Sequence, residues 1–176
     1  MTTDVPNAVV PSEFSRPANP EDAELVHKVY CAAPRYFEII SIPDPSVIEV
    51  RGELEAAFLD KRRFTELLFA PDQDTCSDII DPQTGRQIVG YLDYKLDYPD
   101  AGDGTVNLLL IIESLQSKGL GRHFVNNLES RLRGQVKRLL ASIYGQNHRA
   151  ERFWKTLGYS FAIDAKPVLD WYAKTL

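Results

Sequence analysis

Short apolar runs alternate with amphipathic stretches along this chain, and that alternation is typical of α/β proteins. The clearest run is Leu108–Ile112, an apolar and partly β-branched segment that predicts a buried central strand. A tight turn follows it, and then a helix that should end near Gly134. The apolar residues expected on one face of this helix are Phe124, Val125, Leu128 and Leu132.

The segment before the central strand predicts an arm, an edge strand and two helices. Asn19 stands before Pro20 and two acids, which is a strong helix start, and Pro34 is expected to end that helix. The expected elements are a flexible arm at Met1–Pro11, an edge strand at Phe14–Pro17, and helices at Ala23–Ala33 and Ser46–Lys61.

The remaining elements are expected to be strands and one more helix. Gly85 would supply the positive φ of a tight hairpin turn, and Asn147 and Gly158 would begin and end the helix. That helix would bury Ala150, Phe153, Trp154 and Leu157. The expected strands are Arg63–Ala70, Cys76–Ile80, Gln87–Leu96, Arg138–Tyr144, Ser160–Ile163 and Val168–Lys174.

Length and composition indicate one ordinary globular domain. The 176 residues are 44% hydrophobic and 26% charged, so we expect a flexible arm over residues 1–11 and a single domain over residues 12–176. No apolar run approaches the ~20 residues that span a bilayer. The N-terminus lacks the basic and apolar regions of a secretory leader, and a cytoplasmic protein without membrane association is the expectation. Cys31 and Cys76 are expected to be free thiols, and no spacing indicates a metal site.

The net charge of −5 conceals an asymmetry: residues 116–155 carry +7 and the rest of the chain carries −12. A solvated basic face accounts for part of this block. The acidic total argues against nucleic acid as the partner, and a small phosphorylated ligand fits better. The acids of the loop before the central strand, Asp97, Asp100 and Asp103, together with Asp93, are either solvated or form an electronegative rim for a cationic acceptor.

The turn between the central strand and its helix has the composition of an anion site. Gly119 and Gly121 allow close approach to the backbone, and the first N–H groups of the helix have no intrahelical partners. Lys118 and Arg122 add positive charge. An ordinary strand-to-helix loop is the alternative. The turn is not a Walker A loop, because no Gly-Lys-Ser/Thr follows four residues after a first glycine. It is not a dinucleotide fingerprint either, because Phe124 stands where the third glycine belongs.

Two motifs resemble those of the GNAT superfamily of acetyltransferases. The first is Gln-x-x-Gly-x-Gly at Gln116–Gly121, and the second is Asn-x-x-Ala-x-x-Phe-aromatic-x-x-Leu-Gly-Tyr at Asn147–Tyr159. They occur in the family's order and distance. The resemblance implies one α/β (α+β) domain, with a mixed, mostly antiparallel sheet splayed between two central strands and helices on both faces.

The resemblance also implies an acetyl-CoA-dependent transferase that acetylates a primary amine by direct attack, the acceptor being a small molecule or a peptide. The backbone of Leu109, Leu110 and Ile111 would bind pantetheine, and Asn147 would reach it or the thioester. The turn that would hold the pyrophosphate comprises Gln116, Ser117, Lys118, Gly119, Leu120, Gly121 and Arg122. A homodimer is compatible with the sequence, and no metal is implied.

The chain departs from the family at two catalytic positions. Trp154 replaces the tyrosine that acts as acid in many relatives, and an indole cannot take that role. Ser142 replaces a glutamate base, and Tyr144 shares its face of an extended strand. Tyr144 and Ser142 are therefore the catalytic candidates, with a structural role for Tyr144 as the alternative, and Glu113 is a further carboxylate nearby. A non-catalytic acyl-CoA-binding module is the alternative function.

Overall fold

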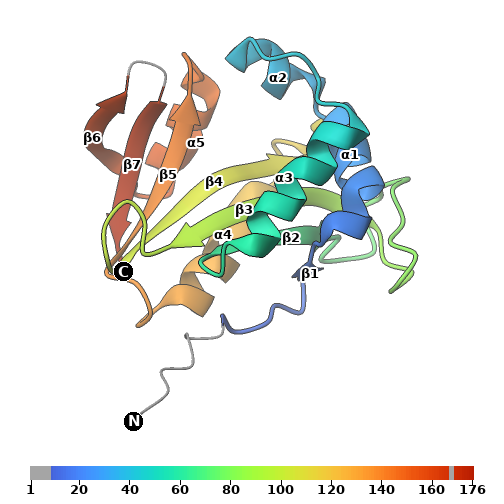
Figure 1. Cartoon of the computed structure of the whole chain (residues 1–176), viewed down its shortest axis with the longest axis horizontal. Helices are drawn as coiled ribbons and strands as arrows, with labels where there is room; N and C mark the ends of the chain where they lie inside the picture. Colours follow the sequence, from blue (N-terminus) through green and yellow to red (C-terminus); the bar gives the residue numbers. More distant parts are fainter. Residues whose placement is uncertain (1–8, 167–168) are drawn as a thin grey trace.

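A seven-stranded sheet in the order β1-β2-β3-β4-β5-β7-β6 forms the centre of the computed structural model, which describes residues 9–166 and 169–176 (Figure 1). The strands are β1 (Ser15–Pro17), β2 (Arg63–Phe69), β3 (Ile88–Leu96), β4 (Asp103–Ile111), β5 (Arg138–Tyr144), β6 (Ser160–Lys166) and β7 (Leu169–Thr175). The helices are α1 (Ala23–Cys31), α2 (Pro34–Ile40), α3 (Val47–Leu59), α4 (Leu120–Leu132) and α5 (His148–Thr156). Short 3-10 turns occupy Pro20–Asp22 and Glu113–Leu115.

The two central strands, β4 and β5, form the one parallel pair among the described strands and separate partway along their length. Their pairing runs from Asp103 opposite Arg138 to Val106 opposite Ala141 and ends there. The other neighbours in the sheet are antiparallel. The expected splay of a mixed, mostly antiparallel sheet is confirmed, and it leaves the second halves of β4 and β5 unpaired with each other.

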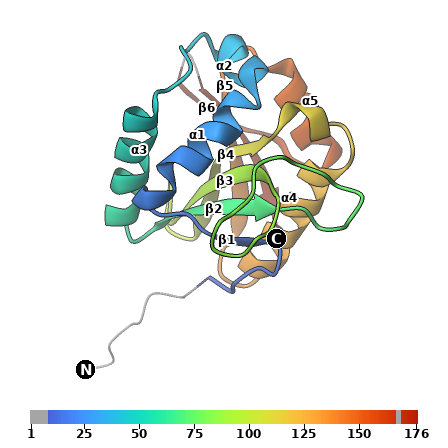
Figure 2. The same ribbon diagram turned by 90° about the vertical axis from the view of Figure 1, so that its right-hand side faces the viewer.

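Helices cover both faces of the sheet (Figure 2). On one face Tyr30 of α1 packs edge-on against Tyr91 of β3, with ring centroids 5.9 Å apart. On the other face Arg131 of α4 donates to both oxygens of Glu66 of β2, at 2.8 and 2.9 Å. The Tyr94 hydroxyl donates to the same carboxylate at 3.0 Å. Because this buried ion pair is hydrogen-bonded on both sides, it fixes α4 against the sheet.

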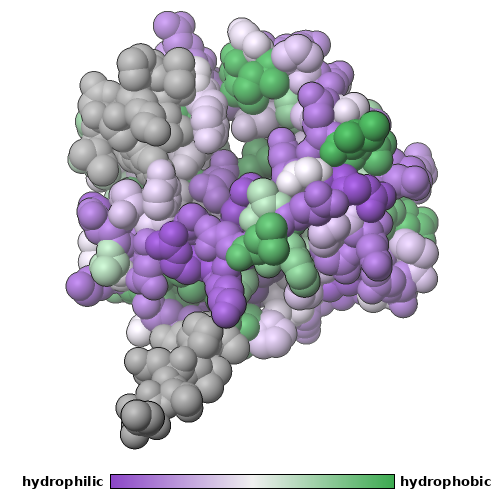
Figure 3. All heavy atoms as spheres, viewed as in Figure 1, coloured by the Kyte–Doolittle hydropathy of each residue, from purple (hydrophilic) through white to green (hydrophobic). Residues whose placement is uncertain are grey.

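The local helix signals act as the sequence predicts. Asn19 and Ser46 each form a capping box with the acid three residues later, Asp22 and Glu49. The C-terminal glycines have positive φ, 84° at Gly134 and 89° at Gly158. β5 has the predicted bounds, and α3 matches its predicted position. Ile48 and Phe58 of α3 are 82% and 73% accessible. Figure 3 shows apolar surface exposed over this helix.

The prediction that Pro34 only ends a helix is wrong. α1 ends at Cys31, and Pro34 is the first residue of α2, where proline's fixed φ suits a helix and its missing N–H costs nothing. Three helices therefore precede the main sheet. One of them, α2, lies beside the splayed strands and was absent from the prediction (Figure 1).

The predicted hairpin between Cys76–Ile80 and Gln87–Leu96 is reduced to one bridge, Ile80 opposite Gln87. Gly85 does take a positive φ of 69° in that turn. β3 instead pairs along its length with β2 and β4. Residues 1–8 of the predicted arm lie outside the described residues, and so does Val168 of the predicted last strand. Val9, also within the predicted arm, is described and packs against the core.

Candidate active site

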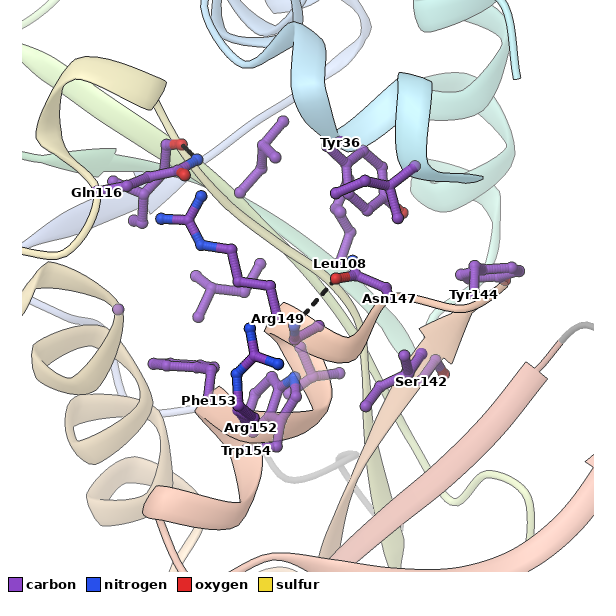
Figure 4. A pocket seen from close by; sticks show the side chains of 18 of the residues that line it. Tyr36, Leu108, Gln116, Ser142, Tyr144, Asn147, Arg149, Arg152, Phe153 and Trp154 are labelled. Atoms are coloured by element: carbon purple, nitrogen blue, oxygen red, sulfur yellow. Dashed lines mark hydrogen bonds between the residues drawn. The ribbon is translucent and has the colours of Figure 1, made fainter. Parts of the chain in front are cut away.

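A pocket of about 480 Å³ opens where β4 and β5 separate. α2, α4, α5 and the loop after β4 complete its wall (Figure 4). The sequence-predicted site residues that line it are Leu109, Leu110, Ile111, Gln116, Ser117, Gly119, Gly121, Arg122, Ser142, Tyr144 and Asn147. Residues from two motifs that are distant in sequence therefore meet in one cavity.

The glycine turn presents the N-terminus of α4 to the pocket. Gly119 is the N-cap residue, with φ of 87°, and no side chain caps this helix. A Cβ at Gly119 would meet nothing within 4 Å, so the backbone conformation rather than crowding favours glycine there. Since the first N–H groups of the 13-residue helix lack a side-chain acceptor, they form a positive end suited to an anion.

Three arginines from two helices surround that positive end. Arg122 of α4 and Arg149 and Arg152 of α5 line the pocket. Arg149 also donates to the Ser117 hydroxyl at 3.2 Å, which ties α5 to the glycine turn. Arg149 and Arg152 belong to the basic block over residues 116–155, but the sequence does not assign them to the site because only the packing of α5 beside α4 brings them there.

Two residues predicted to hold the phosphates lie differently. Lys118 is exposed and is not among the residues that line the pocket, and the Leu120 side chain is 6% accessible and belongs to the core. Like Lys118, Leu120 is not among the residues that line the pocket.

The two polar motif residues, Gln116 and Asn147, have structural bonds of their own. The Gln116 amide nitrogen donates to the Ile111 carbonyl at 2.7 Å and closes the loop after β4. The Asn147 side-chain oxygen accepts from the Ala150 N–H at 3.0 Å as the N-cap of α5 (Figure 4). Both side chains border the pocket while they hold the elements that shape it.

The end of the pocket away from Gln116 carries two phenols (Figure 4). Tyr144 of β5 is 40% accessible, and Tyr36 of α2 lies across the pocket from it. Burial raises the pKa of Tyr144, and the nearby Tyr98 and Asp93 add to that effect. Burial, and then the Tyr144 phenol, raises the pKa of Tyr36. Both hydroxyls therefore stay protonated at neutral pH and can donate hydrogen bonds.

The structure assigns packing or ion-pair roles to other candidates. Trp154 is 5% accessible and packs against Tyr159, with ring centroids 4.8 Å apart. Glu113 is paired with Arg35 at 3.6 Å and is not among the lining residues. Trp154 is thus a core residue.

The electronegative rim does not form from Asp93 and Asp103. Each is 4% accessible and is held by an arginine, Arg63 and Arg138 respectively. Burying a carboxylate is favourable only when it is paired, and both acids satisfy that requirement inside the fold. Asp93 and Asp103 therefore stabilise the fold instead of lining the mouth of the pocket, whereas Asp97 and Asp100 are exposed, as solvated loop acids are.

Among the described residues, no group of three His, Cys, Asp or Glu side chains could hold a metal ion, and no helix is long and apolar enough to cross a bilayer. Both cysteines are free and exposed.

The comparisons with known proteins agree on one family. A family model described as the acetyltransferase (GNAT) family matches residues 40–159, more than half of the chain. An acetyltransferase from Thermus thermophilus is 36% identical over 96% of this chain and 99% of its own, with a TM-score of 0.80. A search of curated proteins gives no match.

Two more distant structures share the fold and were solved with coenzyme A. The PaiA N-acetyltransferase of Thermoplasma acidophilum is 12% identical over 92% of this chain and 98% of its own, with a TM-score of 0.63. The aminoglycoside acetyltransferase AAC(6')-Ib is 15% identical over 92% of this chain and 94% of its own, with a TM-score of 0.69. The family match and the Thermus relative establish what the splayed sheet and the two motifs indicate: the chain belongs to the GNAT acetyltransferase family.

Proposed function

We propose that this protein is an acetyl-CoA-dependent N-acetyltransferase that acetylates a primary amine by direct attack. The observation that carries the proposal is the layout of one pocket. At one end its wall includes a helix N-terminus with three arginines, and at the other end it includes two phenols. Between them lies the half of β4 that is not paired with β5. A long anionic thioester fits that order of groups, with its phosphates at the arginines and its acyl group near the phenols.

The residues present fit coenzyme A by their chemistry. The uncapped N-terminus of α4 and the guanidinium groups of Arg122, Arg149 and Arg152 suit phosphate oxygens, since arginine donates in a planar fork. The backbone of Leu109, Leu110 and Ile111 borders the pocket beyond the last β4–β5 pair, where the polar groups on the β5 side of the strand have no partner on β5 and suit the amides of pantetheine. Asn147 borders the same stretch.

The bound acetyl-CoA would supply an acyl group that is already activated as a thioester, so the chain's own task is positioning and proton transfer. A C–N bond forms to the amine and the C–S bond breaks, which leaves a proton on nitrogen and a charge on sulfur. In this proposal Tyr144 protonates the departing thiolate, which is supported by its position in the pocket lining, and Ser142 borders the pocket on the same strand. The proton that the nitrogen loses would pass to water, and Tyr144 would regain its own proton from water.

Proteins of similar structure indicate which classes of acceptor amine to test. One solved structure of this fold is named as an aminoglycoside acetyltransferase and another as an acetyltransferase of a ribosomal protein's α-amino group. Small-molecule amines and peptide N-termini therefore both belong in the screen.

Calorimetry with acetyl-CoA and CoA, followed by thiol release with a panel of amines, tests the function. The panel contains an aminoglycoside, a polyamine, free amino acids, a peptide N-terminus and a lysine peptide. We expect micromolar CoA binding and amine-dependent thiol release with at least one class. Binding without release from any amine would favour a non-catalytic acyl-CoA-binding module. Absence of CoA binding would overturn both alternatives.

A further inference from the structure

Asn107 lies at the point where β4 leaves β5. Val106 is the last β4 residue paired with β5. On the other side the register with β3 runs from Leu108 opposite Asp93 to Val106 opposite Tyr94, so Asn107 is the extra residue of a bulge. Bulges redirect a side chain, and here the partly buried Asn107 lines the pocket.

A buried ion pair fixes the orientation of the Asn107 amide. Its nitrogen donates to Asp93 Oδ1 at 2.9 Å, and the same carboxylate accepts from Arg63 Nε at 3.0 and 3.1 Å. Asp93 is 4% accessible. A carboxylate that is ion-paired with arginine accepts hydrogen bonds, so the amide nitrogen and not the amide oxygen faces it. The amide oxygen of Asn107 is therefore the acceptor available to the pocket.

That oxygen belongs to the end of the pocket where transfer would occur. Burial raises the pKa of the Tyr144 phenol, and the charges of this ion pair also act on it: Asp93 raises the pKa and Arg63 lowers it. Asn107, Tyr144 and Tyr36 all line the pocket, and they come from β4, β5 and α2. The splay, the bulge and the ion pair thus meet at one place.

We propose that Asn107 binds the acceptor amine: its amide oxygen accepts one N–H of the amine and so directs the nitrogen lone pair toward the acyl carbon. This inference rests on the proposed acetyltransferase function. A neutral primary amine has two N–H donors and one lone pair, so using one N–H restricts where the lone pair points. Asn107 cannot take the proton, and its role is binding and orientation. Asp93 and Arg63 act through it by holding its orientation.

Asn107→Ala and Asn107→Ser form a matched pair that differs by one hydroxyl. Serine can donate to Asp93 and accept from the amine, whereas alanine can do neither. With the best acceptor from the amine screen, we expect Asn107→Ala to lower kcat/KM for the amine at least tenfold and Asn107→Ser to recover at least threefold of that loss. The KM for acetyl-CoA should stay within threefold of wild type. Asn126→Ala, at an exposed position of α4 outside the pocket, is the control and should behave as wild type.

The outcomes separate the inference from the function on which it rests. If wild type acetylates an amine and both Asn107 variants keep its amine kcat/KM, the inference is wrong and the function stands. If the variants lose thermal stability and both substrates' KM values change together, Asn107 only supports Asp93 and the inference is also wrong. If wild type releases no thiol with any amine, both fail. If Asn107→Ala does not fold, the comparison of Asn107→Ser with wild type decides: a lower amine kcat/KM with an unchanged KM for acetyl-CoA supports the inference, and an unchanged amine kcat/KM overturns it.

Discussion

The ring of Phe153 in α5 lies directly over Gly121 in α4. A Cβ built on Gly121 would be 3.0 Å from both Cε2 and Cζ of Phe153. The two glycines of the turn are therefore required for different reasons. Gly119 is needed for its positive φ and has open space around it, whereas Gly121 leaves room for the Phe153 ring. Gly121 allows α5, with Arg149 and Arg152, to approach the first turn of α4.

Gly121→Val should displace Phe153 and move α5 away from the glycine turn. We expect at least a tenfold weaker Kd for CoA in calorimetry together with a lower thermal midpoint, since overpacking costs roughly 1–3 kcal/mol. Adding Phe153→Ala should restore part of the midpoint by removing the clash. Gly119→Val should also weaken CoA binding, through a backbone strain of about 1–2 kcal/mol, and Phe153→Ala should not relieve it. Equal relief in both backgrounds would contradict the assigned contact.

Replacing Arg149 and Arg152 by alanine should weaken CoA binding more at low salt than at high salt. Exposed charges act over about a Debye length, ~10 Å at 0.1 M salt, and screening reduces their contribution. Kd values measured from 20 mM to 500 mM NaCl should converge for the variant and wild type. Arg133→Ala, beyond the end of α4 and outside the pocket-lining set, is the control. A loss of affinity that is constant with salt would indicate lost packing instead.

Tyr144→Phe should lower kcat at least tenfold and leave the Kd for acetyl-CoA nearly unchanged, because a positioned acid contributes about 10²- to 10⁴-fold. Burial raises the pKa of Tyr144 above the usual value of about 10, so the phenol stays protonated across neutral pH and loses its proton only in strong alkali. The fall in kcat at alkaline pH that loss of the Tyr144 proton would cause should be absent from the kcat–pH profile of Tyr144→Phe. Tyr36→Phe is the parallel test of the other phenol. An unchanged kcat in Tyr144→Phe would leave Tyr144 a structural role.

Asp81 should make stability depend on pH. Its carboxylate is fully buried and accepts from Arg16 at 2.8 and 2.9 Å, which lowers the pKa of Asp81 well below its usual range. A depressed folded-state pKa means that the stabilisation is present above the unfolded value of about 4 and is lost as pH falls below it.

Asp81→Asn should accordingly cost roughly 2 kcal/mol at pH 7, the scale of hydrogen bonds to a charged group, and progressively less below pH 4. Urea unfolding at pH 7, 5 and 3 measures the difference. Asp100→Asn, at a side chain 81% accessible, is the control and should have little effect at any of these values. A difference for Asp81→Asn that is independent of pH would contradict the charge-based origin.

The sequence by itself determined the elements whose signals are local. Asn19, Ser46, Gly134 and Gly158 act through neighbours a few residues away, and each ends or begins a helix as predicted. The two family motifs are likewise local patterns, and the resemblance that they carry predicted the splayed sheet and the site residues, most of which line the pocket. The sequence also identified Trp154 as unable to act as the acid, since that depends only on the identity of the side chain.

Tertiary structure alone decided what depends on distant contacts. Pro34 can end one helix or begin another. In the structure it begins α2, which packs beside the splayed strands and brings Tyr36 to the pocket. β3 has two neighbours in the sheet, so the predicted local hairpin gave way to pairing with β2 and β4. The Asn107 amide takes its orientation from Asp93, 14 residues away in sequence, because pairing in a sheet, rather than spacing along the chain, puts a buried charge beside it.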